Sequence, residues 1–263
     1  MLTLNNKPID ITKFPDGALL LKENVLSDVS HGYATIEWFF ENNEELVALI
    51  YLVGHLRQYG VSHINLTMPY IPNARQDRVK HIEDVFTLKY FADIINYLNF
   101  NSVRVLDPHS SVSEALINNI FVDTPKLYIS KAMYNCNPDV LFYPDEGAMK
   151  RYSGMVPFPC VFGIKFRDWA TGKIQGLEVA GDIERIKGAR ILIVDDICSR
   201  GGTFYHSAKK LKELGAKEIH LYVTHCENTI LEGEVLTSGL IEKVYTTNSI
   251  FTKEHEKIEV FEL

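Results

Sequence analysis

The residues best suited to chemistry lie in the stretch 189–203, which reads ARILIVDDICSRGGT. An apolar segment typical of a buried strand ends at two adjacent carboxylates, Asp195 and Asp196, and a short polar loop then leads into a helix-forming segment. Ligands of parallel sheets bind at the carboxyl ends of the strands, and a glycine-rich loop at a helix N-terminus presents N–H groups to an anion. Neighbouring carboxylates can also accept hydrogen bonds from neighbouring hydroxyl groups. The pattern therefore indicates a site for a ribose that carries a 5-phosphate.

A loop with two glycines, taken alone, could be an ordinary strand–turn–helix connection in which an Asp caps the helix. The complete string is more specific. It resembles the phosphoribosyl-diphosphate binding motif that type I phosphoribosyltransferases share with the phosphoribosyl-diphosphate synthetases. That resemblance implies that the acidic pair and the loop hold the ribose and its phosphate, through Asp195, Asp196, Cys198, Ser199, Arg200, Gly201, Gly202 and Thr203.

A second stretch distinguishes those two families. Residues 68–78, MPYIPNARQDR, follow a predicted strand and place Arg75 and Arg78 on either side of Gln76 and Asp77. Guanidinium groups bind polyphosphate through paired hydrogen bonds, although these residues could instead form a solvated loop with an internal Arg–Asp pair. The stretch resembles the PYxxARQDR segment of the ribose-phosphate diphosphokinases, the synthetases named above, in which Arg and Gln contact ATP. Arg75, Gln76 and Arg78 are therefore expected to bind ATP.

Further segments resemble the same family in the same order along the chain. Residues 14–17, FPDG, resemble its F-S-D-G-E segment, whose Phe and Asp hold adenine, often that of a neighbouring subunit, so Phe14 and Asp16 are expected to bind ATP. Residues 107–110, DPHS, resemble its D-L-H-A segment, whose His is a magnesium ligand. This resemblance assigns His109 to Mg²⁺, whereas a lone His after a strand is more often structural.

Two segments of the second half complete the resemblance. Residues 144–147, PDEG, resemble the family's P-D-x-G-G-V-x-R segment, whose Asp serves the ribose and metal region, so Asp145 is the second expected magnesium ligand. Residues 164–167, IKFR, resemble the D-K-R-R segment, whose first Lys and second Arg are catalytic. Lys165 and Arg167 are the expected catalytic residues, although their spacing would also suit one solvated face of a strand.

Departures from the family motifs affect the expected substrates. Ala18 replaces the Glu of the F-S-D-G-E segment, which alters the adenine contacts. The family's D-T-G-G-T loop is here S-R-G-G-T, so Arg200 adds a guanidinium suited to a second phosphate, unless it caps the loop or pairs with a nearby acid. The family also has further elements at both ends, and their absence from this sequence is expected to leave the end of the site near the 5-phosphate open.

The resemblance implies a Mg²⁺-dependent diphosphotransferase with ATP as substrate. The anomeric hydroxyl of a 5-phosphorylated ribose would receive the β,γ-diphosphate of ATP, and AMP would leave, with ribose 5-phosphate as the expected acceptor. An alternative is the same chemistry on ADP-ribose, which would give ADP-ribose 1-diphosphate for NAD regeneration. More remote alternatives are a phosphoribosyltransferase, against which the 68–78 segment argues, and a non-catalytic regulator of the same fold. Because the family's ATP site is shared between subunits, a homodimer or larger homo-oligomer is expected.

The elements that would position these residues alternate between strand and helix. Apolar runs predict strands at 34–40, 63–68, 102–106, 139–143, 160–165, 189–194 and 218–223. Periodic segments predict helices at 88–98 and 204–215, and a further helix that Gly60 ends. We expect an α/β protein of two type I phosphoribosyltransferase-like domains, each a mainly parallel sheet flanked by helices. The expected boundaries are 1–125, a synthetase domain with the ATP segment, and 126–263, which carries the ribose-phosphate loop.

The composition excludes other classes of protein. The chain has 263 residues, of which 46% are apolar and 23% charged, with a net charge of −7, so it is not disordered. Its longest apolar run, 46–53, is too short to span a membrane, and an acidic balance disfavours nucleic acid as a partner. The four cysteines form no CxxC pair and no secretory signal is visible, so a cytoplasmic protein is expected.

Overall fold

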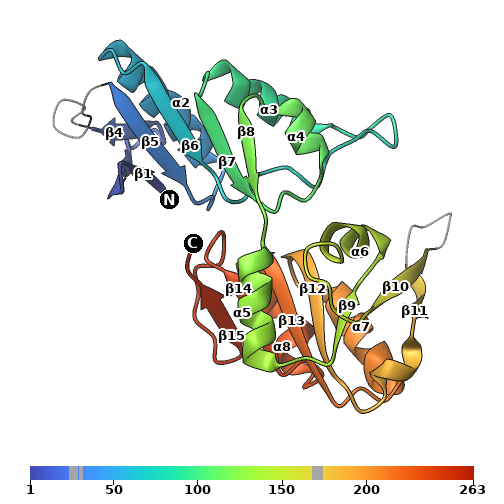
Figure 1. The fold of residues 1–263 in the computed structure, drawn as a ribbon. Helices are drawn as coiled ribbons and strands as arrows, with labels where there is room; N and C mark the ends of the chain where they lie inside the picture. Colours follow the sequence, from blue (N-terminus) through green and yellow to red (C-terminus); the bar gives the residue numbers. More distant parts are fainter. Residues whose placement is uncertain (24–28, 30–31, 168–173) are drawn as a thin grey trace. The chain divides into compact units, whose positions relative to one another are not determined.

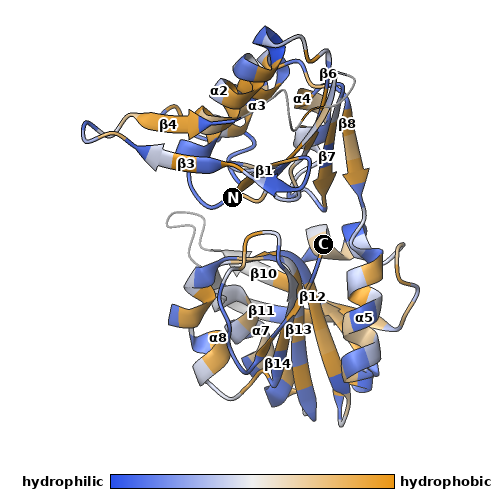
Figure 2. Ribbon diagram, turned by 90° about the vertical axis from the view of Figure 1, so that its left-hand side faces the viewer, coloured by the Kyte–Doolittle hydropathy of each residue, from blue (hydrophilic) through white to orange (hydrophobic). Residues whose placement is uncertain are grey.

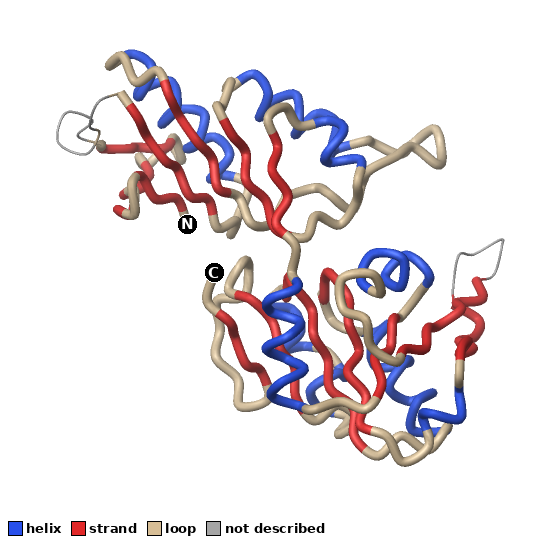
Figure 3. The backbone as a smooth tube through the Cα atoms, in the orientation of Figure 1, coloured by secondary structure: helices blue, strands red, loops and turns tan. Residues whose placement is uncertain are grey.

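The computed structural model describes residues 1–23, 29, 32–167 and 174–263 (Figure 1). The chain forms two compact units, Met1–Thr124 and Pro125–Leu263. Each unit consists of a sheet with helices packed against it (Figure 3). The expected α/β class, with two mainly parallel sheets flanked by helices, is confirmed. No helix among the described residues is long and apolar enough to cross a bilayer.

The first unit contains a six-stranded sheet and a separate hairpin. In spatial order the sheet strands are β2 (Lys7–Pro8), β1 (Leu2–Leu4), β5 (Tyr33–Trp38), β6 (His63–Thr67), β7 (Ser102–Leu106) and β8 (Ile120–Asp123). Strands β5 to β8 are parallel, and the short β1 pairs antiparallel with both β2 and β5. The hairpin consists of β3 (Asp10–Lys13) and β4 (Leu19–Lys22).

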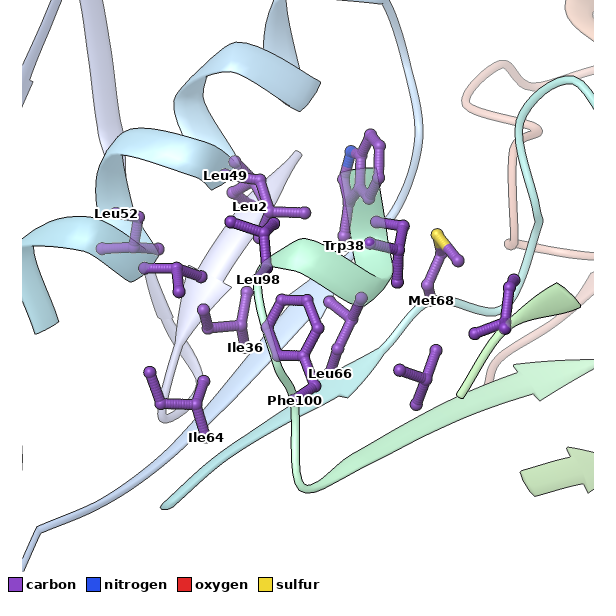
Figure 4. Packing of buried hydrophobic residues seen from close by; sticks show 14 of the residues in the cluster. Leu2, Ile36, Trp38, Leu49, Leu52, Ile64, Leu66, Met68, Leu98 and Phe100 are labelled. Atoms are coloured by element: carbon purple, nitrogen blue, oxygen red, sulfur yellow. The ribbon is translucent and has the colours of Figure 1, made fainter. Parts of the chain in front are cut away.

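Helices α2 (Glu44–Gln58), α3 (Thr87–Tyr97) and α4 (Val112–Leu116) connect the parallel strands. Because these strands follow one another in chain order and such crossovers are right-handed, the helices fall on one face of the sheet. Leu49 and Leu52 of α2 lie with Ile36, Ile64 and Leu66 of the sheet in one buried cluster (Figure 4). This packing fixes the carboxyl ends of β6 and β7, which are followed by segments 68–78 and 107–110.

The second unit contains a seven-stranded sheet. Its strands, in spatial order, are β11 (Ile174–Gly181), β10 (Cys160–Arg167), β9 (Val140–Tyr143), β12 (Arg190–Cys198), β13 (Glu218–Cys226), β14 (Lys243–Thr247) and β15 (Ile258–Phe261). All pairs are parallel except that of the edge strand β11 with β10. Figure 2 shows apolar residues in the central strands and a mixture of apolar and hydrophilic residues on the flanking helices.

Both faces of the second sheet are covered. Helices α5 (Lys126–Cys136) and α6 (Glu146–Tyr152) pack on the face that carries Leu192 of β12. Helix α7 (Gly202–Glu213) and the short α8 (Glu234–Thr237) pack on the face that carries Ile191 and Ile193. The remaining short elements are two 3-10 helices, η1 (Ile183–Ile186) and η2 (Asn228–Glu232).

The order of the strands reverses at the two central strands, β9 and β12, which are neighbours in the sheet. The connection from β9 leads to β10 on one side, and the connection from β12 leads to β13 on the other. In such sheets the carboxyl ends of the two central strands border a crevice that binds ligands. Asp145 follows β9, and the acidic pair lies near the end of β12, so these carboxylates lie where ligands of such sheets bind.

Candidate active site

The glycine-rich loop joins β12 to α7, and Gly201 is the N-cap residue of the helix. Gly201 has φ +78°, and a Cβ atom there would lie 2.2 Å from Val235 Cγ2, so a side chain at this position would be both strained and obstructed. Because this N-cap residue is a glycine, it provides no side-chain cap for α7. Since the first N–H groups of a helix have no partner within the helix, this end of α7 is suited to an anion.

A guanidinium group lies beside one member of the acidic pair. Asp196 is buried, and Arg151 Nη1 of α6 lies 3.4 Å from Asp196 Oδ2. Asp195 Oδ1 accepts a hydrogen bond of 3.0 Å from the Asp196 N–H. Burial of its carboxyl group raises the pKa of Asp195 well above its usual range, and the carboxylates of Asp196 and Asp145 raise it further. The pair therefore concentrates negative charge that hydroxyl donors or a cation would relieve.

Asp145, an expected magnesium ligand, is the N-cap of α6. One of its carboxylate oxygens accepts a hydrogen bond of 3.0 Å from the Ala148 N–H. Its charge is close enough to Asp195 to raise the pKa of that residue, which places Asp145 beside the acidic pair. Among the described residues, no three His, Cys, Asp or Glu side chains form a cluster that could hold a metal. Mg²⁺ does not require such a cluster, because it commonly binds through one or two carboxylates, water and substrate phosphates.

In the first unit, the loops that follow β6 and β7 meet. The buried Asp77 carboxylate accepts two hydrogen bonds from Arg78, of 2.6 and 2.7 Å, and a third from Ser110. These bonds, led by that of Arg78, together with the charges of Arg78 and His109, lower the pKa of Asp77 to about 2. The internal Arg–Asp pair thus exists, and it holds the largely exposed Arg78 side chain in a fixed orientation.

The other expected ATP-binding residues of this unit lie in the loop between β6 and α3 and in the turn between β3 and β4. Gln76 is attached to the start of α3, because its side-chain oxygen accepts a hydrogen bond of 2.8 Å from Thr87, which leaves its amide NH₂ to donate to a ligand. Arg75 is exposed beside it. Phe14 and Asp16 lie in the exposed turn between β3 and β4, where Asp16 accepts from the Ala18 N–H at 3.0 Å.

The expected catalytic residues, Lys165 and Arg167, belong to β10. Their backbone pairs with the edge strand β11, and the register of that pairing shifts between Phe166 and Arg167. Such irregularities are frequent beside active sites. The side chains of Lys165 and Arg167 lie outside the described part of the structure.

Two contacts connect the loop to η2. Arg200 Nη2 lies 3.0 Å from Glu232 Oε2, so its guanidinium has an acidic partner on η2, one of the alternatives considered for it. Ser199 Oγ lies 3.2 Å from Thr229 Oγ1, also on η2. These partners lie about thirty positions away in sequence and belong to no family motif described above, so only the tertiary structure identifies them.

Comparisons with known proteins agree with this architecture. The N-terminal domain of ribose phosphate pyrophosphokinase matches residues 1–98, and the phosphoribosyl transferase domain matches residues 129–238. The crystal structure of phosphoribosylpyrophosphate synthetase from Mycobacterium smegmatis superposes with a TM-score of 0.77 at 18% identity, covering 97% of this chain and 86% of that one. This likeness shows the fold.

Curated relatives extend the similarity to sequence. The ribose-phosphate pyrophosphokinase of Thermococcus kodakarensis is 27% identical over 250 residues, which cover 93% of this chain and 86% of the relative. That of Aquifex aeolicus is 29% identical over 259 residues, covering 95% and 82%. The two units and the loop at the carboxyl end of β12 define a protein of phosphoribosyltransferase type. The chain belongs to the ribose-phosphate pyrophosphokinase family and is a diphosphotransferase enzyme.

Proposed function

We propose that this enzyme transfers the β,γ-diphosphate of ATP to the anomeric hydroxyl of ribose 5-phosphate. The observation that carries the proposal is the acidic pair followed by a helix N-terminus whose cap residue is a glycine, at the point where the strand order reverses between β9 and β12. This arrangement offers acceptors for two ribose hydroxyls beside N–H donors for a phosphate. Asp195 and Asp196 bind the hydroxyls, and residues 198–203 bind the 5-phosphate.

ATP is bound by residues of the first unit. Arg75 and Arg78 hold its phosphates, and Gln76 donates a hydrogen bond from its amide. Phe14 and Asp16 bind adenine, and because they lie in an exposed hairpin turn, we propose that they serve a neighbouring subunit in a homodimer or larger assembly. The Asp77 carboxylate fixes the Arg78 guanidinium before ATP arrives, which reduces the entropy lost on binding.

The reaction is an in-line displacement at phosphorus. The anomeric oxygen forms a bond to the β-phosphorus of ATP and gives its proton to water, while the bond from this phosphorus to the α,β-bridging oxygen breaks and AMP leaves. The protein forms no covalent intermediate, so it acts by positioning and by charge stabilisation. Lys165 and Arg167 neutralise the charge that develops on the bridging oxygen and on the transferred phosphates.

Magnesium fits the chemistry of the second unit, where burial, together with the charges of Asp196 and Asp145, raises the pKa of Asp195. Asp145 of the second unit and His109 of the first unit are each proposed to hold Mg²⁺, directly or through water. When bound, the ion would neutralise charge on the β- and γ-phosphates of ATP. Because the reaction consumes ATP and yields AMP, we place the enzyme in the cytoplasm.

ADP-ribose is the second candidate acceptor, favoured by Arg200. The side chain of Arg200 is 71% exposed, and its one acidic partner among the described residues is Glu232, which is also exposed. Exposed ion pairs contribute about 0–1 kcal/mol, so a second phosphate could replace Glu232 at little cost. Such an acceptor would give ADP-ribose 1-diphosphate.

The test is AMP release from Mg-ATP with ribose 5-phosphate, with ADP-ribose and with no acceptor, compared as kcat/KM. We expect AMP only when an acceptor is present, and more with ribose 5-phosphate. Preference for ADP-ribose that Arg200→Thr reverses would establish the second candidate. No AMP with either acceptor would contradict the proposed function.

A further inference from the structure

A segment outside the proposed binding residues contacts the glycine-rich loop, residues 198–203, here called the phosphate loop. Residues 227–235, called here the brace segment, follow β13 and include η2 and the start of α8. The Glu227 N–H donates to the Cys198 carbonyl at 2.8 Å. A Cβ atom on Gly233 would lie 1.9 Å from the Arg200 carbonyl oxygen. The backbones of the brace segment and the loop are therefore in direct contact.

Side chains continue this contact. Thr229 Oγ1 donates a hydrogen bond to Glu227 Oε2 at 3.1 Å and also lies 3.2 Å from Ser199 Oγ. A hydroxyl group has one proton, so Thr229, which gives its proton to Glu227, accepts from Ser199. The direction of the chain is thereby fixed: Ser199 donates to Thr229, and Thr229 donates to Glu227.

This chain of hydrogen bonds begins at Ser199, a residue proposed to bind phosphate. Each of its three members is half-buried, so neither hydrogen bond lies fully in solvent. A serine hydroxyl next to an anion site has three rotamers, and only an orientation toward the ligand is useful. The bond to Thr229 selects one position of the Ser199 oxygen. When a phosphate binds, both protons can turn without movement of the oxygens: Ser199 then donates to a phosphate oxygen and Thr229 donates to Ser199, so the bond between the two hydroxyls is kept.

We propose that Thr229 is a positioning residue for the phosphate of the acceptor, acting through Ser199 and itself oriented by Glu227. This inference rests on the proposed role of residues 198–203 as the phosphate site. A purely structural hydroxyl would affect folding alone, whereas a positioning residue affects acceptor binding through Ser199.

The variant Thr229→Val keeps the shape of the side chain and removes both hydrogen bonds. We expect the KM for the phosphorylated acceptor to rise about 3- to 10-fold, the range that one neutral hydrogen bond supports. The kcat at saturating acceptor and the KM for ATP should remain within about twofold of the wild-type values. The substitution weakens binding of the acceptor equally in the ground state and in the transition state, and such a loss raises KM without lowering kcat. Thr229→Ser, which keeps the hydroxyl, should restore the wild-type KM and also guards against a folding defect of the valine variant.

The chain offers a matched control in Thr252. Its hydroxyl accepts a hydrogen bond of 2.9 Å from Asn228, the neighbour of Thr229, but this bond leads away from the loop. Thr252→Val should therefore leave the KM for the acceptor unchanged. Ser199→Ala provides the second arm: because Thr229 acts through Ser199, adding Thr229→Val to Ser199→Ala should cause no further loss.

The binding measurement is titration calorimetry with ribose 5-phosphate and with ADP-ribose, together with melting temperatures of all variants. We expect Thr229→Val alone to bind the acceptor more weakly and Thr229→Ser to bind it as the wild type does. In the Ser199→Ala background, Thr229→Val should not weaken binding further. Wild-type affinity in Thr229→Val, equal loss in Thr229→Ser or Thr252→Val, or an additive loss on Ser199→Ala would overturn the inference. If the wild-type enzyme binds neither compound, the proposed function itself fails and the inference with it.

Discussion

Arg151 Nη1 lies 3.4 Å from Asp196 Oδ2, so a guanidinium group from α6 neutralises one of the two adjacent carboxylates at the end of β12. Among the described contacts, the neighbouring carboxylate of Asp195 has no such guanidinium beside it, and the pKa of Asp195 is raised. The two carboxylates therefore differ in electrostatic environment although they are neighbours in sequence. This difference yields separate predictions for the two residues.

Arg151→Met should destabilise the protein, because it leaves the buried Asp196 charge without its partner. Removing one partner of a fully buried pair costs about 3–5 kcal/mol, and since Arg151 is partly exposed we expect about 1–3 kcal/mol in urea unfolding. In an Asp196→Asn background the same substitution should cost much less. Equal costs in the two backgrounds would show that Arg151 stabilises the fold by packing alone.

Asp195→Asn should stabilise the metal-free protein at neutral pH while weakening binding of the acceptor. The pKa of Asp195 is higher in the folded than in the unfolded state, so the native protein binds more protons between those two pKa values. Wild-type stability should therefore fall as pH rises through that window, and the variant should lose this dependence. Melting temperatures at pH 4 to 8 with a chelator measure it. The exposed Asp182→Asn serves as control, and a variant that melts below wild type at pH 7 would contradict the prediction.

Asp77→Asn should weaken ATP binding, because the amide holds Arg78 less firmly than a carboxylate does. We expect the KM for ATP to rise about 3- to 10-fold, with little change in the KM for the acceptor. The pKa of Asp77 is lowered to about 2, so its contribution to stability is present above the ordinary value of 3.8 and is lost as pH falls toward 2. Asp84→Asn changes another loop carboxylate, one bound to the N–H groups of Lys80 and His81, and should leave the KM for ATP unchanged.

Lys165→Ala should lower kcat far more than it weakens ATP binding, because its proposed role is to stabilise the transition state. Loss of one such group costs about 10²–10³-fold in kcat. Direct titration of ATP gives the binding term separately. Lys150→Ala removes an exposed lysine that pairs with Glu146 and should keep normal turnover. A Lys165→Ala enzyme with near-normal kcat would remove this residue from the mechanism.

Much of the fold could be predicted because its central strands are continuous apolar runs. Residues 102–106 form β7 with the expected bounds, and the helix expected at 88–98 is α3, shifted by one residue. The strand expected at 189–194 extends as β12 through Cys198, so the acidic pair belongs to the strand itself rather than to the loop. Polar residues at the end of a strand weaken the apolar signal, although the ladder with β13 continues.

The contacts that hold the candidate site could not be predicted in the same way. Ser199 and Thr229 are 30 positions apart in the sequence, and Arg200 and Glu232 are 32 positions apart. No local or periodic sequence pattern connects the two members of either pair. The pair of Arg78 with Asp77 is local, and the sequence did suggest it as one alternative. Motif resemblance suggested side chains for binding, whereas the side chains that orient them depend on tertiary packing.

The transfer of an intact diphosphate is tested most directly by identifying the products with ³¹P NMR. The wild-type enzyme, with Mg-ATP and ribose 5-phosphate, should form AMP and a ribose bearing a diphosphate at C1 in equal amounts. ADP as the nucleotide product would mean transfer of a single phosphoryl group, and free diphosphate without a C1-diphosphate would mean hydrolysis. Either result would contradict the proposed reaction.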